Sequence, residues 1–151
     1  MDFLEKRLSP EIEGFLQGIC ATSEVHYQEG GAAIEYQRVS TLGMKEDSDI
    51  HRYTHDPNTS DRFALPTDEM TKFAGFLARV IGNYSPSSQQ VAQAETLGKF
   101  IVQKLQENLQ FSFITCDVEY DRGEISGSAD LIMTTRQHRC FHIITFHWQV
   151  D

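Results

Sequence analysis

Lysine and arginine are scarce in this chain, and they do not cluster. Asp and Glu number 22 against 13 Lys and Arg, which gives a formal net charge of −9 at pH 7. Sequence-independent binding to DNA or RNA depends on clustered cations that displace counterions from phosphates. The composition therefore argues against a nucleic-acid-binding protein. It suits a basic protein partner, because opposite charges speed the encounter of two proteins, and it equally fits an acidic surface that serves solubility alone.

Cysteine is scarcer still, with three widely spaced residues at Cys20, Cys116 and Cys140. Each lies within an apolar pattern, so we expect buried, reduced thiols and neither a disulfide framework nor a zinc site. Burial also makes a thiol a poor nucleophile. The sequence contains no Gly-x-Ser-x-Gly elbow and no glycine-rich phosphate loop, so nucleophilic catalysis has little support.

Long apolar runs are missing as well. No segment approaches the roughly eighteen consecutive apolar residues of a membrane helix. The N-terminus, which starts Met1-Asp-Phe-Leu, lacks the apolar core of a secretion signal. A hydrophobic fraction of 40% and a charged fraction of 23% are ordinary for a globular protein. We therefore expect one domain over residues 1–151, located in the cytoplasm, or in the nucleus of a eukaryote.

Three segments repeat apolar residues at the spacing of one helix face. Serine or threonine stands at the start of each, where its side chain can cap free N–H groups, and proline follows it in two of them. The expected helices begin at Ser9-Pro10, at Thr67 and at Ser85-Pro86, and their apolar stripes cover Ile12–Cys20, Phe73–Ile81 and Val91–Leu109. Gly82 is expected to end the second helix, and the third runs to about Asn108.

Alternation of apolar and polar residues predicts five strands. The first two form a hairpin over residues 25–39 around Gly30-Gly31, a pair that tolerates the positive φ of tight turns. The other three follow one another over residues 114–120, 125–133 and 139–150. The predicted fold is therefore α+β, with a mostly antiparallel five-stranded sheet covered by three helices in the order α-β-β-α-α-β-β-β.

The last third of the chain offers a first candidate site. A helix containing Glu95 and Gly98 precedes a strand with Glu119 and a strand with the sequence Gly-Ser-Ala-Asp130. This succession resembles the RecB-like branch of the PD-(D/E)XK nucleases, in which a helix with Gly-x-x-x-His precedes strands with Gly-x-x-Asp and Glu/Asp-x-Lys. The resemblance implies a nuclease or phosphodiesterase in which Asp130, Glu119 and Glu95 hold Mg²⁺ or Mn²⁺, which activates water.

The resemblance covers residues 95–148 and departs from the family pattern at three positions. Val102 stands in place of the helix histidine, Thr145 in place of the second carboxylate, and His147 in place of the lysine. The resemblance therefore implies the fold with a degenerate catalytic set. A plain antiparallel sheet in which Asp130 faces water explains the same residues.

A second candidate site lies in the polar segment 43–66, which is longer than the ~12–15 residues usual for a structureless loop. His51 and His55 are four residues apart there, and Asp56 follows them. On a helical turn the two histidines share one face, and with the aspartate they could hold Zn²⁺. On an extended loop the same side chains are simply solvated, so both interpretations stay open.

Histidines also occur at and just before the last expected strand. His142 and His147 are an odd number of residues apart, so on a strand they project to opposite faces and cannot hold one ion together. We expect these two and His138 to be satisfied by hydrogen bonds. Trp148 is expected to anchor the core, although a tryptophan near a chain end can also anchor an interface.

Two functional hypotheses result. The first is a non-enzymatic, acidic protein-binding module of the inhibitor, immunity-protein or adaptor type, which engages a basic protein without a cofactor. The alternative is a metal-dependent nuclease or phosphodiesterase of a degenerate PD-(D/E)XK-like fold. The first predicts a contiguous acidic patch, whereas the second requires carboxylates that converge on one metal.

Overall fold

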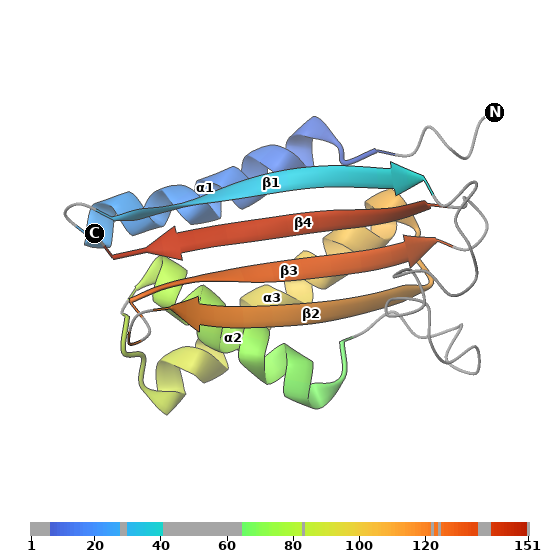
Figure 1. Ribbon diagram of the computed structural model, residues 1–151. Helices are drawn as coiled ribbons and strands as arrows, with labels where there is room; N and C mark the ends of the chain where they lie inside the picture. The colour runs from blue at the N-terminus through green and yellow to red at the C-terminus, as the bar shows by residue number, and fades with distance from the viewer. Residues whose placement is uncertain are drawn as a thin grey trace.

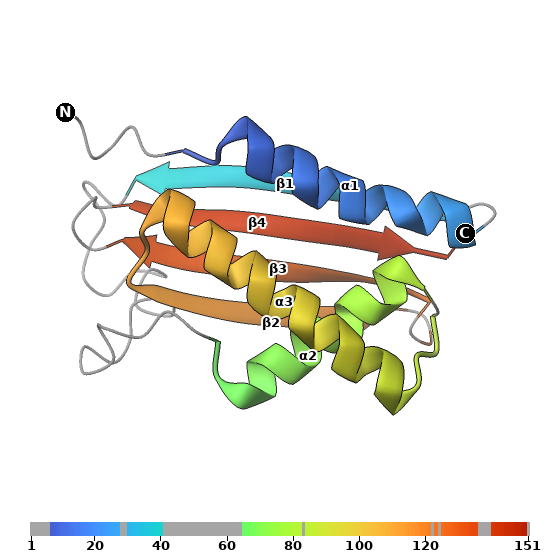
Figure 2. The same ribbon diagram turned by 180° about the vertical axis from the view of Figure 1, so that it is seen from behind.

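The computed structural model describes residues 7–27, 30–40, 65–82, 84–121, 123, 125–135 and 140–150. In this part of the chain, three helices cover one face of a four-stranded antiparallel sheet (Figure 1, Figure 2). The opposite face, which points away from the helices, is called the outer face below. The elements are α1 (Pro10–His26), β1 (Gly31–Ser40), α2 (Thr67–Ile81), α3 (Ser88–Leu109), β2 (Phe113–Asp121), β3 (Ser126–Thr135) and β4 (Cys140–Gln149).

The predicted α+β class is confirmed, but the sheet formed by the described residues has four strands and not five. The prediction of a strand that starts at Val25 is wrong, because α1 continues through Val25 to His26. The first strand of the sheet is β1, which begins at Gly31. Val25 is 81% exposed on the last turn of that helix. A short alternation such as Val25-His-Tyr27 fits a helix end as well as a strand, and contacts from elsewhere in the fold decide between them.

Those contacts come from the end of α2. Ser23 Oγ donates a hydrogen bond to Val80 O, and Tyr27 Oη donates one to Arg79 O at 2.5 Å. Carbonyls in the last turn of a helix have no partner within that helix, so the side chains of α1 satisfy acceptors that burial would otherwise leave unpaired. The two bonds hold the C-terminal ends of α1 and α2 side by side.

Two of the three described helices start at a side-chain cap. The predicted cap Thr67 is wrong, because Pro66 is the N-cap of α2 and no side chain caps that helix. Ser9 caps α1 as predicted, and its side chain accepts a hydrogen bond from a backbone N–H in the first turn at 3.3 Å. The predicted start of α3 at Ser85-Pro86 is slightly early. Ser87 is the cap instead, because its side chain and that of Gln90 bond reciprocally to backbone N–H groups in a capping box.

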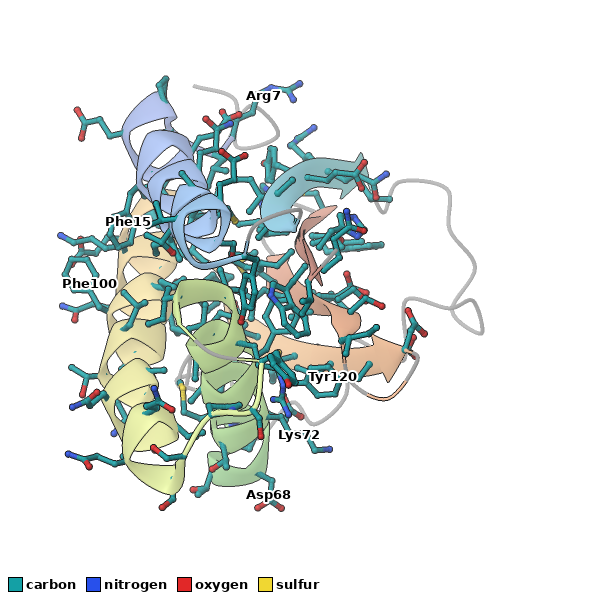
Figure 3. The ribbon with its side chains drawn as sticks, turned by 90° about the vertical axis from the view of Figure 1, so that its left-hand side faces the viewer. Arg7, Phe15, Asp68, Lys72, Phe100 and Tyr120 are labelled. Atoms are coloured by element: carbon teal, nitrogen blue, oxygen red, sulfur yellow. The ribbon has the colours of Figure 1, made fainter. Side chains whose placement is uncertain are left out.

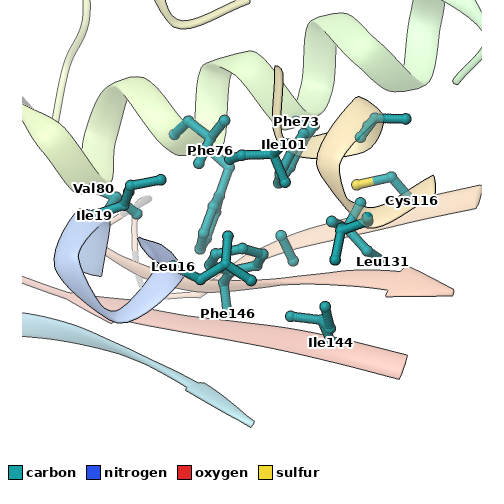
Figure 4. Close-up of a cluster of buried hydrophobic side chains, with 14 of the residues drawn as sticks. Leu16, Ile19, Phe73, Phe76, Val80, Ile101, Cys116, Leu131, Ile144 and Phe146 are labelled. Atoms are coloured by element: carbon teal, nitrogen blue, oxygen red, sulfur yellow. The ribbon is translucent and has the colours of Figure 1, made fainter. Parts of the chain in front are cut away.

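Strand β4 lies in the centre of the sheet and pairs along its whole length with β1 on one side and β3 on the other. Side chains at its even positions face the helices, and Phe146 packs there with ring centroids 5.8 Å from Phe73 and 6.4 Å from Phe76 (Figure 4). The predicted burial of Trp148 and of the three thiols is confirmed, and all three cysteines are free.

Helix α3 packs mainly against α2, which it crosses on the side away from the sheet (Figure 2). Gly98 lies at this crossing. A β-carbon added there would lie 3.3 Å from Met70 Sδ and 3.4 Å from Phe73 Cδ2, so glycine allows the two helices to approach closely. Helix packing therefore accounts for this glycine. Within the described ranges, no helix has the length and hydropathy needed to cross a membrane.

Two glycine-to-alanine substitutions are expected to change stability in opposite directions. At Gly127 in β3, an added β-carbon would lie 2.6 Å from Glu119 O and 2.8 Å from Tyr120 Cδ1, so Gly127→Ala should lower the free energy of unfolding by about 1–3 kcal/mol. At Gly14 in α1 nothing lies within 4 Å, so Gly14→Ala should raise it by roughly 0.5–1 kcal/mol. Urea unfolding measures both, and equal effects would contradict the packing described.

Alkaline pH is expected to destabilise the fold through a buried thiol. Burial raises the pKa of Cys20 from 9.0 to about 11, so the folded state keeps a proton that the unfolded chain loses. Stability from this group is present below pH 9 and is lost as pH rises toward 11, by up to about 3 kcal/mol. Unfolding measured across that range should show a shallower pH slope in Cys20→Ala, and an unchanged slope would contradict the assignment.

Candidate functional site

The outer face of the sheet carries the strongest local charge among the described strands. Because side chains alternate along each strand and paired residues share a face, the registers place five carboxylates there. They are Glu35, Asp117, Glu119, Asp121 and Asp130. The described strand residues include one arginine, Arg38, and it faces the helices, opposite His142. The outer face therefore has no lysine or arginine among the described strand residues.

The exposed part of this face is the end that carries the carboxylates. Four of the five acidic side chains are exposed, and Asp130 is partly buried. At the other end of the same face, Phe113, Ile132, Thr134 and Phe141 are all buried, with relative exposures of 8% or less. A partner that approaches the outer face therefore meets carboxylates first. The name acidic patch is used below for the five carboxylates together.

Two members of the acidic patch stand directly opposite each other. Asp117 on β2 pairs with Asp130 on β3, and Thr145 on β4 is the other neighbour of Asp130. Like charges directly across a strand pair destabilise a sheet, and partial exposure to water and salt lowers that repulsion. Glu119 pairs with Ser128, so it lies diagonally from Asp130. The patch is therefore contiguous across β2 and β3.

The residues implied by the nuclease resemblance do not all come together. Asp130 and Glu119 share the outer face, with Thr145 beside Asp130. Glu95 lies instead on α3, in the helix layer behind the sheet, where its Oε1 is 3.2 Å from Lys99 Nζ. A metal held at Asp130 would therefore have to be held without Glu95. No described contact tests the catalytic assignment, and it stays a prediction.

The described residues also bear on a metal site, which needs several ligand side chains close together. Among the residues that the structure describes, no group of three His, Cys, Asp or Glu side chains is arranged to hold a metal ion. The predicted ligands His51, His55 and Asp56 lie outside the described residues, as does His138. The zinc site in segment 43–66 and the Mg²⁺ or Mn²⁺ of the nuclease hypothesis therefore stay predictions.

The two histidines of β4, His142 and His147, point to opposite faces of the sheet, as predicted. His147 is on the outer face, and its Nε2 lies 3.4 Å from Glu35 Oε2 on the neighbouring strand, with both side chains more than half exposed. His142 is on the inner face and is completely buried. His147 therefore lies beside the acidic patch, whereas His142 belongs to the interior.

A buried chain of polar side chains around His142 was not predicted from the sequence. Its Nδ1 lies 2.7 Å from Tyr36 Oη, and its Nε2 lies 3.7 Å from Cys140 Sγ. A thiol beside an imidazole that a third group orients is also the arrangement of a cysteine nucleophile. Here Cys140 and His142 are both fully buried, so the sulfur is not accessible to a substrate. The three side chains instead satisfy one another's polar groups in the protein interior. Their spacing of two residues on one predicted strand was the signal that could have indicated the contact.

Beside the acidic patch, the sheet is hollowed into a shallow groove of about 590 Å³. It lies where β1 begins and β4 ends, at the left of the sheet in Figure 1. The outer-face residues that line it from β1 and β3 are small, namely Gly31, Ala33, Ser126 and Ser128. Larger polar residues stand around them, namely Glu24 on α1, Asp121 on β2, and His147 and Gln149 on β4. In Figure 3 the outer-face side chains project away from the helix layers.

Comparison with protein-family models, with curated proteins and with solved structures found no match.

Removing the opposed charge at Asp130 is expected to stabilise the fold. Asp130→Asn keeps the size of the side chain and ends the repulsion with Asp117, so the free energy of unfolding should rise by roughly 0.2–1 kcal/mol at low salt. The gain should shrink at high salt. Asp121→Asn, whose cross-strand partner is Ser126, is the matched control and should gain less. A loss of stability in Asp130→Asn would mean that this carboxylate makes a favourable contact instead.

Proposed function

We propose that this protein is a non-enzymatic binding module that engages a basic protein through the acidic patch. The observation that carries the proposal is the gathering of five carboxylates on one sheet face that has no described lysine or arginine. Complementary charge of this kind accelerates association and selects against acidic partners. An inhibitor, an immunity protein or an adaptor would use such a face.

The form of the patch supports a docking role. A paired antiparallel sheet holds its side chains at fixed spacing, so the patch is preorganised and loses little conformational entropy when a partner binds. The core on the other face stabilises the sheet independently of the patch. Opposed carboxylates such as Asp117 and Asp130 reduce the stability of the free protein. A partner that brings positive charge between them removes that repulsion, and this difference favours the bound state.

The breadth of the patch also supports a protein partner. The carboxylates are spread across β1, β2 and β3 with Glu35 and Asp121 at separate corners. Charge spread over a surface suits contact with many positive groups of a protein. The nuclease hypothesis stays the alternative, with Asp130 and Glu119 as its outer-face residues.

A peptide-binding measurement tests the proposal. Fluorescence anisotropy would give the dissociation constant of a labelled decapeptide of alternating lysine and alanine at low ionic strength. The double variant Asp117→Asn/Glu119→Gln should bind about fivefold more weakly, because two exposed charge pairs are lost. The matched control is Glu11→Gln/Glu13→Gln in the first turn of α1, which removes the same net charge away from the patch.

The control variant should bind within about twofold of the wild type, because its charges lie outside the docking face. Equal weakening in both double variants would show that binding follows overall charge and would overturn the patch as the docking face. Absence of binding by the wild type would count against a basic partner altogether.

A further inference from the structure

The groove beside the acidic patch is open to a long side chain from a partner. On the outer face, Ser126 and Ser128 of β3 stand between His147 and Gln149 of β4 on one side and the carboxylates of β2 on the other. Adjacent strands lie ~4.8 Å apart, so the taller rows are about 10 Å apart across the short serines. The serine row therefore forms a trough, and the groove of about 590 Å³ extends from it across β4 to Gly31 and Ala33.

The Asp and Glu side chains around the trough all carry negative charge. Asp121 and Glu24 line the groove, Glu119 is the cross-strand partner of Ser128, and Asp130 is the next outer-face residue along β3. None of the described lining residues is lysine or arginine. An incoming cation therefore finds the carboxylates of β2 on one side of the trough and serine hydroxyl oxygens on its floor, and both kinds of group accept hydrogen bonds.

We propose that this groove receives an arginine side chain of the basic partner, an inference that rests on the proposed function. A guanidinium is flat, donates up to five hydrogen bonds in a fixed fork, and is weakly hydrated. It can lie over the small serines while its N–H groups reach the carboxylates of β2. A lysine ammonium is compact and strongly hydrated, so in an open groove it gains only screened attraction. The groove therefore discriminates arginine from lysine, whereas the acidic patch attracts both.

The test compares two labelled decapeptides, one of alternating arginine and alanine and one of alternating lysine and alanine. The wild-type protein should bind the arginine peptide about fivefold more tightly, the ratio expected from additional charge-assisted hydrogen bonds at a solvent-exposed site. Filling the trough with Ser128→Tyr should abolish this preference and leave the affinity for the lysine peptide within about twofold of the wild type. Tyrosine suits a half-buried strand position, so the sheet should tolerate it.

Two further variants serve as a control for Ser128→Tyr and as a substitute for it. Gln37→Tyr places the same side chain on the exposed outer face of β1 outside the groove, and it should keep the preference for arginine. Ala33→Tyr fills the groove from β1 and repeats the experiment if Ser128→Tyr does not fold. Circular dichroism would verify folding of each variant.

The outcomes separate this inference from the proposed function. Equal affinity of the wild type for both peptides, or equal weakening of both by Ser128→Tyr, would overturn the arginine site. The acidic patch would survive that result if Asp117→Asn/Glu119→Gln still weakened both peptides. No binding of either peptide would overturn the proposed function together with the arginine site. Loss of the preference in Ser128→Tyr but not in Gln37→Tyr is the result that supports the groove.

Discussion

The pairing of β1 with β4 is the contact on which the rest of the structure depends. The two strands come from opposite ends of the chain and pair antiparallel from Gly31 opposite Gln149 to Ser40 opposite Cys140. Because side chains alternate, this register turns Ile34 toward the helices and Glu35 away from them. A slip of one residue would exchange the two faces and bury a carboxylate in the core, which is costly.

The same register makes the outer face acidic without weakening the core. On the inner face, Phe146 packs among the rings of α2, and α1 is tied to the end of α2 by the hydroxyl groups of Ser23 and Tyr27. Most of the hydrophobic core lies on this inner side. The exposed end of the outer face carries polar and charged residues, including the opposed pair Asp117 and Asp130, whose repulsion the core can tolerate.

Strand alternation and capping chemistry account for most of what could be predicted. They place Asp130 on the polar face of its strand, separate His142 from His147, and put Ser9 at the start of α1. The prediction failed at Val25, because a few alternating residues fit either a strand or a helix end and the deciding bonds come from α2. The groove was not predicted, because its small residues come from different strands and only pairing makes them neighbours.

The sequence by itself determined the acidic balance, the periodicity of most elements and the side of each strand on which its carboxylates stand. These properties depend on composition and on the local geometry of the backbone, which repeats along each element. Only the tertiary structure decided that β1, β2 and β3 present their carboxylates on one face, while Glu95 lies in the helix layer behind it. Strand neighbours are chosen by the burial of the whole core, and that energy belongs to contacts between residues far apart in the chain.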